Sequence, residues 1–159
     1  MIRDYQAIQK SWFIKGQQKI IKTYGKHEGV KLLGVLDYET GKVYMEDHES
    51  YDAQVFLYFL RNVLKKYPTG NIVMILDNAR IHHAKLLTSF LLENSRLHLE
   101  FLPPYSPNLN IIEELWGWLK STVINNVFFH TRDEIKAAVR SFLIYIDAIP
   151  LTVIDGLCI

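Results

Sequence analysis

Ile72-Val73-Met74-Ile75-Leu76-Asp77 is the stretch that decides the fold: five apolar residues without polar alternation, followed directly by a carboxylate. Such a run, bounded by turn residues, is typical of a parallel strand that is buried on both faces. Ligands bind at the carboxyl ends of the strands in open α/β sheets, where Asp77 could hold a divalent ion. Asp77 and Asn78 could equally form a turn or cap the next helix, and spacing alone does not separate these readings.

Hydrophobic patterning around this run predicts strands first, then alternating helices and strands, then helices. The predicted strands are Gln18–Tyr24, Gly29–Tyr38, Lys42–Glu46, Ile72–Leu76 and Leu97–Leu102; the predicted helices are Tyr51–Tyr67, Ala84–Glu93, Ile111–Ile124 and Arg132–Asp147. Thr131 and Glu134 form a capping box at the start of the last helix. The order predicts an α/β fold in which a mixed sheet has helices on both faces.

The bulk properties fit one ordered domain that covers residues 1–159, with 49% hydrophobic and 22% charged residues. Cys158 is the only cysteine, which excludes an intrachain disulfide and a cysteine-based zinc site and suits a reducing compartment. The sequence has no apolar run as long as a membrane span and no hydrophobic signal core. We therefore expect a cytoplasmic protein.

Positive charge is concentrated in residues 1–27, which hold six Lys or Arg and one acid, a net +5 against −4 for the remainder and +1 for the whole chain. A basic arm on an acidic body is compatible with phosphate contacts, although many soluble proteins have such a face. Lys15, Lys19 and Lys22 are the candidate nucleic-acid contacts in this arm.

Glu113 and Glu114 lie in the first turn of the predicted helix 111–124. Acids there are favoured by about 0.3–1 kcal/mol through the helix dipole, which is a sufficient structural reason for them. If one of the pair serves a site at the sheet edge, Glu113 is the better placed, because it flanks the apolar stripe on the side of Trp116 and Lys120. Glu114 points toward Trp118. We expect both tryptophans to pack rather than to stack on bases.

His82 and His83 follow Asp77 by five and six positions. Neighbouring histidines on a helix point in different directions, so we do not expect them to share a zinc ion. We expect one to pack or to contact a phosphate, and His82 and Lys120 complete the candidate nucleic-acid contacts. Asp37 is most simply a turn residue.

Two blocks carry a resemblance to a known family. ILDNARIHHAK (Ile75–Lys85) and FLPPYSPNLNIIEELWGWLK (Phe101–Lys120) resemble the second and third acidic blocks of mariner-type DDE transposases, and within that superfamily the bacterial insertion-sequence branch numbered six hundred and thirty. The 35 residues between Asp77 and Glu113 suit the spacing of that superfamily. The last block usually reads Asn-Pro-Ile-Glu; here Ile111 replaces the proline, at a helix start rather than at a ligand.

The resemblance implies an RNase H-like fold, a mixed sheet flanked by helices with three carboxylates at one edge. Asp77 and Glu113 would be the second and third of these acids, both catalytic and metal-binding. The three would bind two Mg²⁺ or Mn²⁺ ions for phosphodiester hydrolysis and strand transfer in DNA transposition. The implied partners are DNA, at the transposon ends and the target, and a second copy of the chain in a homodimer, without a membrane or a small-molecule cofactor.

The chain departs from the family pattern at its first acid. In the family, that acid ends the first strand, some residues before a Trp-x-x-x-Gly element, which Trp12–Gly16 supplies here. Asp4 is the only acid before Trp12, and the three residues before it are too few for the central strand. We therefore expect the first acid, its strand and the family's helix-turn-helix region to lie upstream of Met1, with Asp4 as the alternative acid.

Three functions follow from these observations. The first is that the chain belongs to an active DDE transposase, as a partial or frameshifted product, and is inactive on its own. Alternatively, it is a non-catalytic transposase remnant that acts as a weak DNA-binding or interaction module. A generic RNase H-like nuclease is the third reading, which the mariner-type blocks disfavour.

Overall fold

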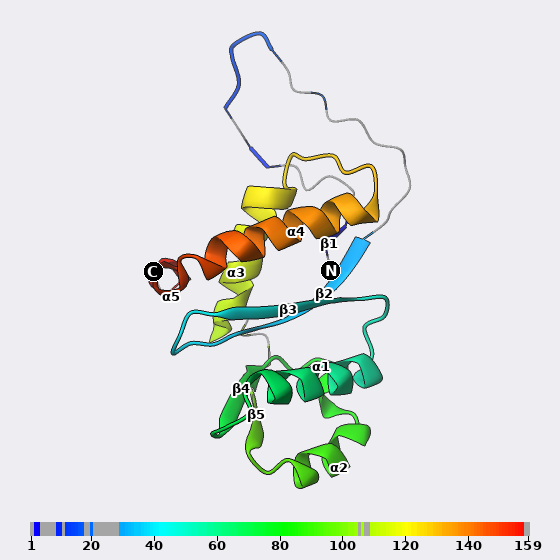
Figure 1. Cartoon of the computed structure of the whole chain (residues 1–159). Helices are drawn as coiled ribbons and strands as arrows, with labels where there is room; N and C mark the ends of the chain where they lie inside the picture. Colours follow the sequence, from blue (N-terminus) through cyan, green and yellow to red (C-terminus); the bar gives the residue numbers. More distant parts are fainter. Residues whose placement is uncertain are drawn as a thin grey trace.

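The structure is a computed structural model that describes residues 2–3, 9–10, 12–17, 20, 29–104, 106 and 109–157 (Figure 1). Its strands are β1 (Ile2–Arg3), β2 (Gly29–Leu36), β3 (Val43–His48), β4 (Ile72–Leu76) and β5 (Leu97–Phe101). Its helices are α1 (Ala53–Lys66), α2 (Leu86–Glu93), α3 (Ile111–Leu119), α4 (Arg132–Asp147) and α5 (Pro150–Leu157), with a 3₁₀ helix η1 (Arg80–His83) and a π-helical turn η3 (Lys120–Ile124). In the described ranges no helix has the length and apolar character of a membrane span.

The strands form two sheets. β2 and β3 make an antiparallel hairpin, and β1 pairs with the first two residues of β2, Ile2 with Val30 and Arg3 with Gly29. β4 and β5 form a separate parallel pair. Among the described residues no backbone ladder joins the two sheets. Ile2 and Arg3 thus form a strand, although a very short one, where the sequence predicted none.

The helices cover these sheets in two hydrophobic cores (Figure 1). We call one the α3–α4 core; its buried residues are Val30, Leu32, Leu115, Leu119, Ile124, Phe129, Ile135, Val139, Phe142, Ile146, Val153 and Leu157. We call the other the α1–α2 core; its buried residues are Leu33, Phe56, Phe59, Leu60, Val63, Leu64, Met74, Leu87, Phe90 and Leu97. Successive side chains of a strand point to opposite faces, so β2 contributes Val30 and Leu32 to the first core and Leu33 to the second.

The burial predicted for β4 is wrong. Met74 is buried in the α1–α2 core, but Val73 and Ile75 are 61% and 58% exposed. Helices α1 and α2 pack against the other face of the β4–β5 pair, and no described element covers the face that carries Val73 and Ile75. The doubly covered strand is β2.

The remaining element predictions hold with changes at their ends. The predicted strand Gln18–Tyr24 lies outside the described residues except for Ile20. The predicted helix 84–93 is α2, which begins at Leu86, and the 3₁₀ helix η1 before it was not predicted. The predicted helix 111–124 becomes α3 followed by the π turn η3. Helix α4 has the predicted bounds, and Glu134 N–H donates to Thr131 Oγ1 at 3.3 Å. The carboxylate of Glu134, however, accepts from the His130 amide rather than from the amide of the cap residue.

The tip of the β2–β3 hairpin is a tight turn that contacts the start of α5. Asp37 is a turn residue as predicted, because its Oδ1 accepts from the amides of Glu39 and Thr40 at 3.0 and 3.2 Å. Gly41 has a φ of +70°, and a Cβ on it would lie 1.9 Å from the carbonyl oxygen of Pro150. Only glycine fits this position, for reasons of both conformation and space. Helix α5 itself was not predicted.

Candidate functional site

Asp77 lies directly after β4, at the carboxyl end of the parallel pair, and its side chain is 63% exposed. Its Oδ1 accepts from the Ala79 amide at 3.1 Å, which forms an Asx turn. The same oxygen lies 3.0 Å from His82 Nδ1. Both sequence readings of Asp77 are therefore compatible with the structure, since one oxygen makes a turn while the side chain stays accessible.

The residues around Asp77 are tied to both neighbouring elements. The His82 ring packs on Phe56 of α1, with 4.4 Å between ring centroids. Asn78 Nδ2 donates to the carbonyl of Leu102, at the end of β5, and Asn78 Oδ1 lies 3.2 Å from His83 Nε2. The end of β4 is thus held to α1 on one side and to β5 on the other.

Glu113 is exposed in the first turn of α3, beside Glu114. One turn further on, the indole of Trp116 lies against β2, where a Cβ on Gly34 would be 3.1 Å from its Cη2 atom. The absence of a side chain at Gly34 lets the helix approach the strand closely. The position of Glu113 is therefore set by the packing of α3 on β2, and both tryptophans of α3 pack against the α3–α4 core as the sequence predicted.

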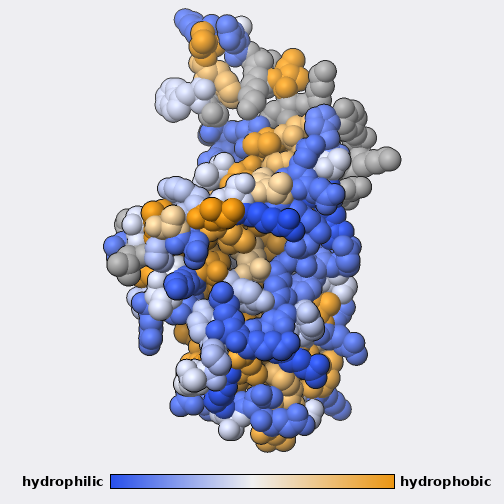
Figure 2. Space-filling model, in the orientation of Figure 1, coloured by the Kyte–Doolittle hydropathy of each residue, from blue (hydrophilic) through white to orange (hydrophobic). Residues whose placement is uncertain are grey.

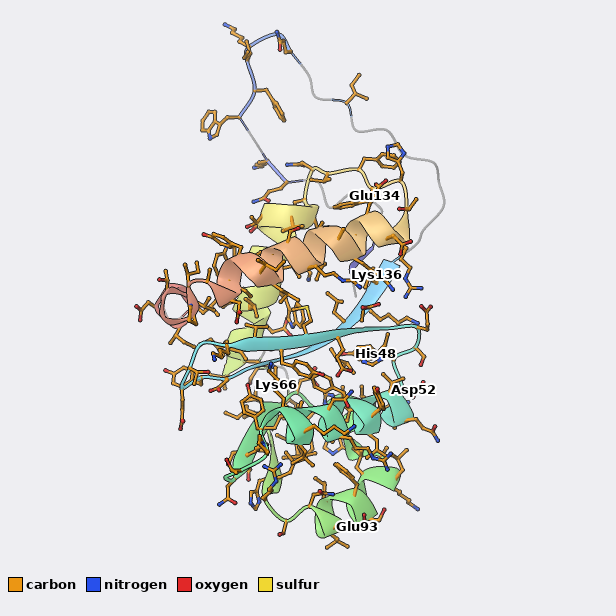
Figure 3. All side chains as sticks on the ribbon, in the orientation of Figure 1. His48, Asp52, Lys66, Glu93, Glu134 and Lys136 are labelled. Carbon is orange, nitrogen blue, oxygen red and sulfur yellow. The ribbon has the colours of Figure 1, made fainter. Side chains whose placement is uncertain are left out.

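Tyr51 lies within electrostatic range of both candidate acids. Burial raises the pKa of its hydroxyl, and the negative charges of Asp77 and Glu113 raise it further. Tyr51 directly precedes Asp52, whose Oδ1 caps α1 by accepting from Gln54 and Val55 at 2.9 Å each (Figure 3). The pKa of Tyr51, just before α1, thus depends on two carboxylates that are 36 positions apart in sequence. Nothing in the sequence pointed to Tyr51.

The donors near Tyr51 suit a hard cation only in part. Asp77 and Glu113 offer carboxylate oxygens, and Mg²⁺ is commonly held by one or two carboxylates with several waters. Within the described part of the chain, no group of three or more His, Cys, Asp or Glu side chains has the arrangement of a metal site. The described residues therefore offer the expected cation two candidate acids, and Asp4, the alternative first acid, lies outside them.

The other predicted contacts are spread over the molecule. Lys15 is exposed beside Gly16, and Lys120 is exposed where α3 passes into η3. Lys19, Lys22 and Asp4 lie outside the described residues. His82 is only 9% exposed, because Phe56 and Asp77 enclose it. Figure 2 shows apolar side chains at the top of the view, where residues 9–17 lie, and Trp12, Phe13 and Ile14 are exposed there.

Comparison with known proteins identifies relatives along most of the chain. A family model described as DDE superfamily endonuclease matches residues 1–136. The insertion element IS630 uncharacterized 39 kDa protein of Shigella sonnei is 31% identical over 144 residues, which are 90% of this chain and 42% of the relative. The chain thus spans less than half the length of that curated relative.

Solved structures of Mos1 share the fold. The Mos1 transposase paired-end complex with left transposon end has a TM-score of 0.63 and 18% identity, over 94% of this chain and 48% of that chain. The Mos1 mariner paired end complex with Mn has a TM-score of 0.63 and 16% identity, over 94% and 51%. The Mos1 strand transfer complex has a TM-score of 0.60 and 16% identity, over 94% and 50%. At these identities the likeness concerns the fold alone.

These matches confirm the predicted resemblance to DDE transposases and to the insertion-sequence branch. They also support the mixed α/β fold, which is similar to that of Mos1. The roles of Asp77 and Glu113 and the predicted central strand stay predictions.

Proposed function

The chain belongs to the DDE superfamily endonuclease family, and from that premise we propose that it is part of a DNA transposase catalytic domain in which Asp77 and Glu113 bind a divalent cation. The observation that carries the proposal is the placement of two exposed carboxylates, Asp77 directly after β4 and Glu113 in the first turn of α3. Both negative charges also raise the pKa of Tyr51. One acid follows β4 and the other begins α3, yet both act on one phenol. The proposed domain covers residues 1–159.

The proposed cation is Mg²⁺ or Mn²⁺. Carboxylate oxygens are hard ligands that suit both ions, and one of the similar structures is a Mos1 complex with Mn. When bound, such a cation would supply Lewis acidity for phosphodiester hydrolysis and strand transfer. The chain's own residues present exposed carboxylates at the carboxyl end of β4 and the start of α3, on packed elements that limit their movement.

The proposed macromolecular partner is DNA. The similar Mos1 structures include a strand transfer complex and a paired-end complex with a transposon end. Lys15, Lys19, Lys22 and Lys120 are the proposed phosphate contacts, and His82 remains a weaker candidate because so little of its side chain is exposed. A homodimer is proposed on the same family grounds, and the paired-end complexes are compatible with it.

Mn²⁺ titration by NMR tests the site directly. Paramagnetic broadening of the amide signals of Asp77 and Glu113 should appear first, because both would lie next to the ion. Asp77→Asn and Glu113→Gln should each weaken Mn²⁺ binding by about 10-fold or more. Glu114→Gln is the matched control and should leave the affinity unchanged. Broadening that is the same in wild type and in Asp77→Asn would refute the proposed cation site.

The gap between β2 and β4 supports a further proposal about the fold. We infer that a strand from polypeptide preceding Ile2 lies there, because β1 pairs with only two residues of β2 and no described ladder joins the two sheets. An extended chain should then show tighter metal binding and a single cooperative unfolding transition. If extension changes neither property, the missing-strand proposal fails.

A non-catalytic remnant is the second candidate function, and it applies to this polypeptide alone if Asp4, the only acid before Trp12, is not a metal ligand. Nicking of supercoiled plasmid DNA separates the two. We expect no nicking by this chain in Mg²⁺ or Mn²⁺. Metal-dependent nicking that disappears in Asp77→Ala would show instead that the 159 residues are catalytically sufficient.

A further inference from the structure

His82 and His83 hold two consecutive residues at the end of β4. His82 Nδ1 lies 3.0 Å from Asp77 Oδ1 and 3.1 Å from the Asp77 carbonyl oxygen. His83 Nε2 lies 3.2 Å from Asn78 Oδ1. The sequence predicted that the two rings point apart, and they do, but each contacts one residue of the Asp77-Asn78 pair.

The contacts of His82 fix its tautomer. A carboxylate oxygen and a carbonyl oxygen are both acceptors, so Nδ1 must carry the proton and donate to them. The backbone adds to this arrangement, since the His82 amide donates to the Ala79 carbonyl at 2.9 Å, which closes η1 onto Asp77. The imidazole is thereby oriented by its own short helix.

The His82 ring is held in place by the α1–α2 core. It packs on Phe56, which is 2% exposed, with 4.4 Å between the ring centroids. Because the ring is only 9% exposed, it has little freedom to leave Asp77. The exposed Asp77 carboxylate is in this way connected to the buried face of α1.

The two oxygens of Asp77 have different surroundings. Oδ1 accepts from the Ala79 amide and from His82, whereas Oδ2 has no hydrogen-bond partner among the described residues. A ligating carboxylate is commonly held through one oxygen by neighbouring groups, which orients the other oxygen toward the metal. In Asp77, likewise, Oδ1 is held by neighbouring groups and Oδ2 is left for a ligand.

We propose that His82 is a positioning residue for Asp77: its Nδ1–H holds Oδ1 and directs Oδ2 to the cation. The inference rests on the proposed function, in which Asp77 is a cation ligand. In this role His82 acts through Asp77 and not by contact with the cation. Its contribution is to orient Asp77 before the cation binds, so that less ordering is needed upon binding.

Two substitutions at His82 separate the hydrogen bond from packing. His82→Phe keeps an aromatic ring against Phe56 and removes the donor. His82→Asn places an amide donor near the position of Nδ1 and removes the ring. We expect Mn²⁺ affinity, measured by broadening of the Ala79 amide signal, to fall about 10–100-fold in His82→Phe. His82→Asn should recover most of that loss, although it packs less well.

His83→Phe is the matched control. It keeps a ring near Phe101, which His83 contacts at 4.2 Å between centroids, and removes the bond to Asn78 instead. We expect a clearly smaller loss of affinity than in His82→Phe. Equal losses in the two variants, or wild-type affinity in His82→Phe, would overturn the proposal, as would a His82→Asn variant as weak as His82→Phe with an unchanged melting temperature.

A metal-free measurement decides the hydrogen bond independently of cation binding. Long-range ¹H–¹⁵N NMR should show His82 with its proton on Nδ1, and a proton on Nε2 alone would refute the arrangement. If Mn²⁺ broadens the wild type and Asp77→Asn alike, the proposed cation site fails. The position of the His82 proton would then still test the hydrogen bond from His82 Nδ1 to Asp77.

Discussion

β2 and β4 are both strongly apolar strands, but the structure uses them differently. β2 places alternate side chains in the α3–α4 core and the α1–α2 core, whereas β4 buries one face and exposes Val73 and Ile75. The difference shows that an apolar run indicates only that a strand can be buried. The elements packed against the strand determine whether one face or both faces are covered. Asp77 follows β4 in the α1–α2 half, and Glu113 begins α3 in the α3–α4 half. The candidate site therefore depends on how the two halves pack together.

Substitutions in the two cores give the largest expected effects and test how independent the halves are. Leu115→Ala and Leu60→Ala remove side chains that are 0% exposed, one from each core, and each should destabilise its half by about 2–5 kcal/mol. Trp116 and Trp118 both lie in the α3–α4 half. Leu115→Ala should therefore shift the unfolding midpoint detected by tryptophan fluorescence, and Leu60→Ala should shift mainly the far-UV circular dichroism.

Equal effects of the two substitutions on tryptophan fluorescence would contradict the independence of the two halves. If Leu60→Ala moves the fluorescence midpoint as far as Leu115→Ala does, the side chains of the β2–β3 hairpin couple the two cores into one cooperative unit. The proposed joining strand would then not be needed for cooperativity.

Gly41 offers a smaller but sharper test, because it joins the hairpin tip to the α3–α4 half. Gly41 and Gly70 both have positive φ, +70° and +78°, but a Cβ on Gly70 would meet no atom within 4 Å. Gly70→Ala should cost about 1–2 kcal/mol from backbone conformation. Gly41→Ala should cost about 1–3 kcal/mol more, from the overlap with Pro150. Chemical denaturation measures both, and equal losses would show that the hairpin tip moves away from α5 without penalty.

Sequence patterning predicted the elements of the two cores well, because periodicity and caps act locally. The start of α4 followed from Thr131 and Glu134, and the turn at Asp37 followed from its residue types. The single-faced burial of β4 could not be predicted, since it depends on which elements lie across the sheet. The same holds for the close approach of Trp116 to Gly34, which joins residues 82 positions apart.

The candidate site was predictable as residues but not as an arrangement. The family blocks pointed to Asp77 and Glu113. His82, five positions after Asp77, was expected only to pack or to contact a phosphate, and not to contact Asp77. No sequence pattern singled out Tyr51, because its position relative to the two acids follows from the packing of α1 in the α1–α2 core. Contacts between distant elements are what a single sequence conveys least.

The smallest expected effect comes from an ion pair within the α3–α4 half, between Lys136 Nζ of α4 and Asp47 Oδ2 of β3 at 2.6 Å (Figure 3). The hydrogen bond from Lys136 lowers the pKa of Asp47 below its usual 3.8. A lowered folded-state pKa adds stability that is complete above the unfolded value and is lost as the pH falls through the folded value. Because Asp47 is partly exposed, we expect less than about 1 kcal/mol.

Asp47→Asn should therefore lower stability near pH 6 and make little difference well below pH 3.8, where the wild-type carboxyl is also protonated. Lys136→Met removes the other partner and should produce the same loss of pH dependence. We expect the change in the fluorescence-detected transition, because α4 and the β3 residues Val43 and Met45 pack in the α3–α4 core together with the tryptophans of α3. If both variants keep the wild-type acid dependence, Lys136 does not stabilise the Asp47 carboxylate.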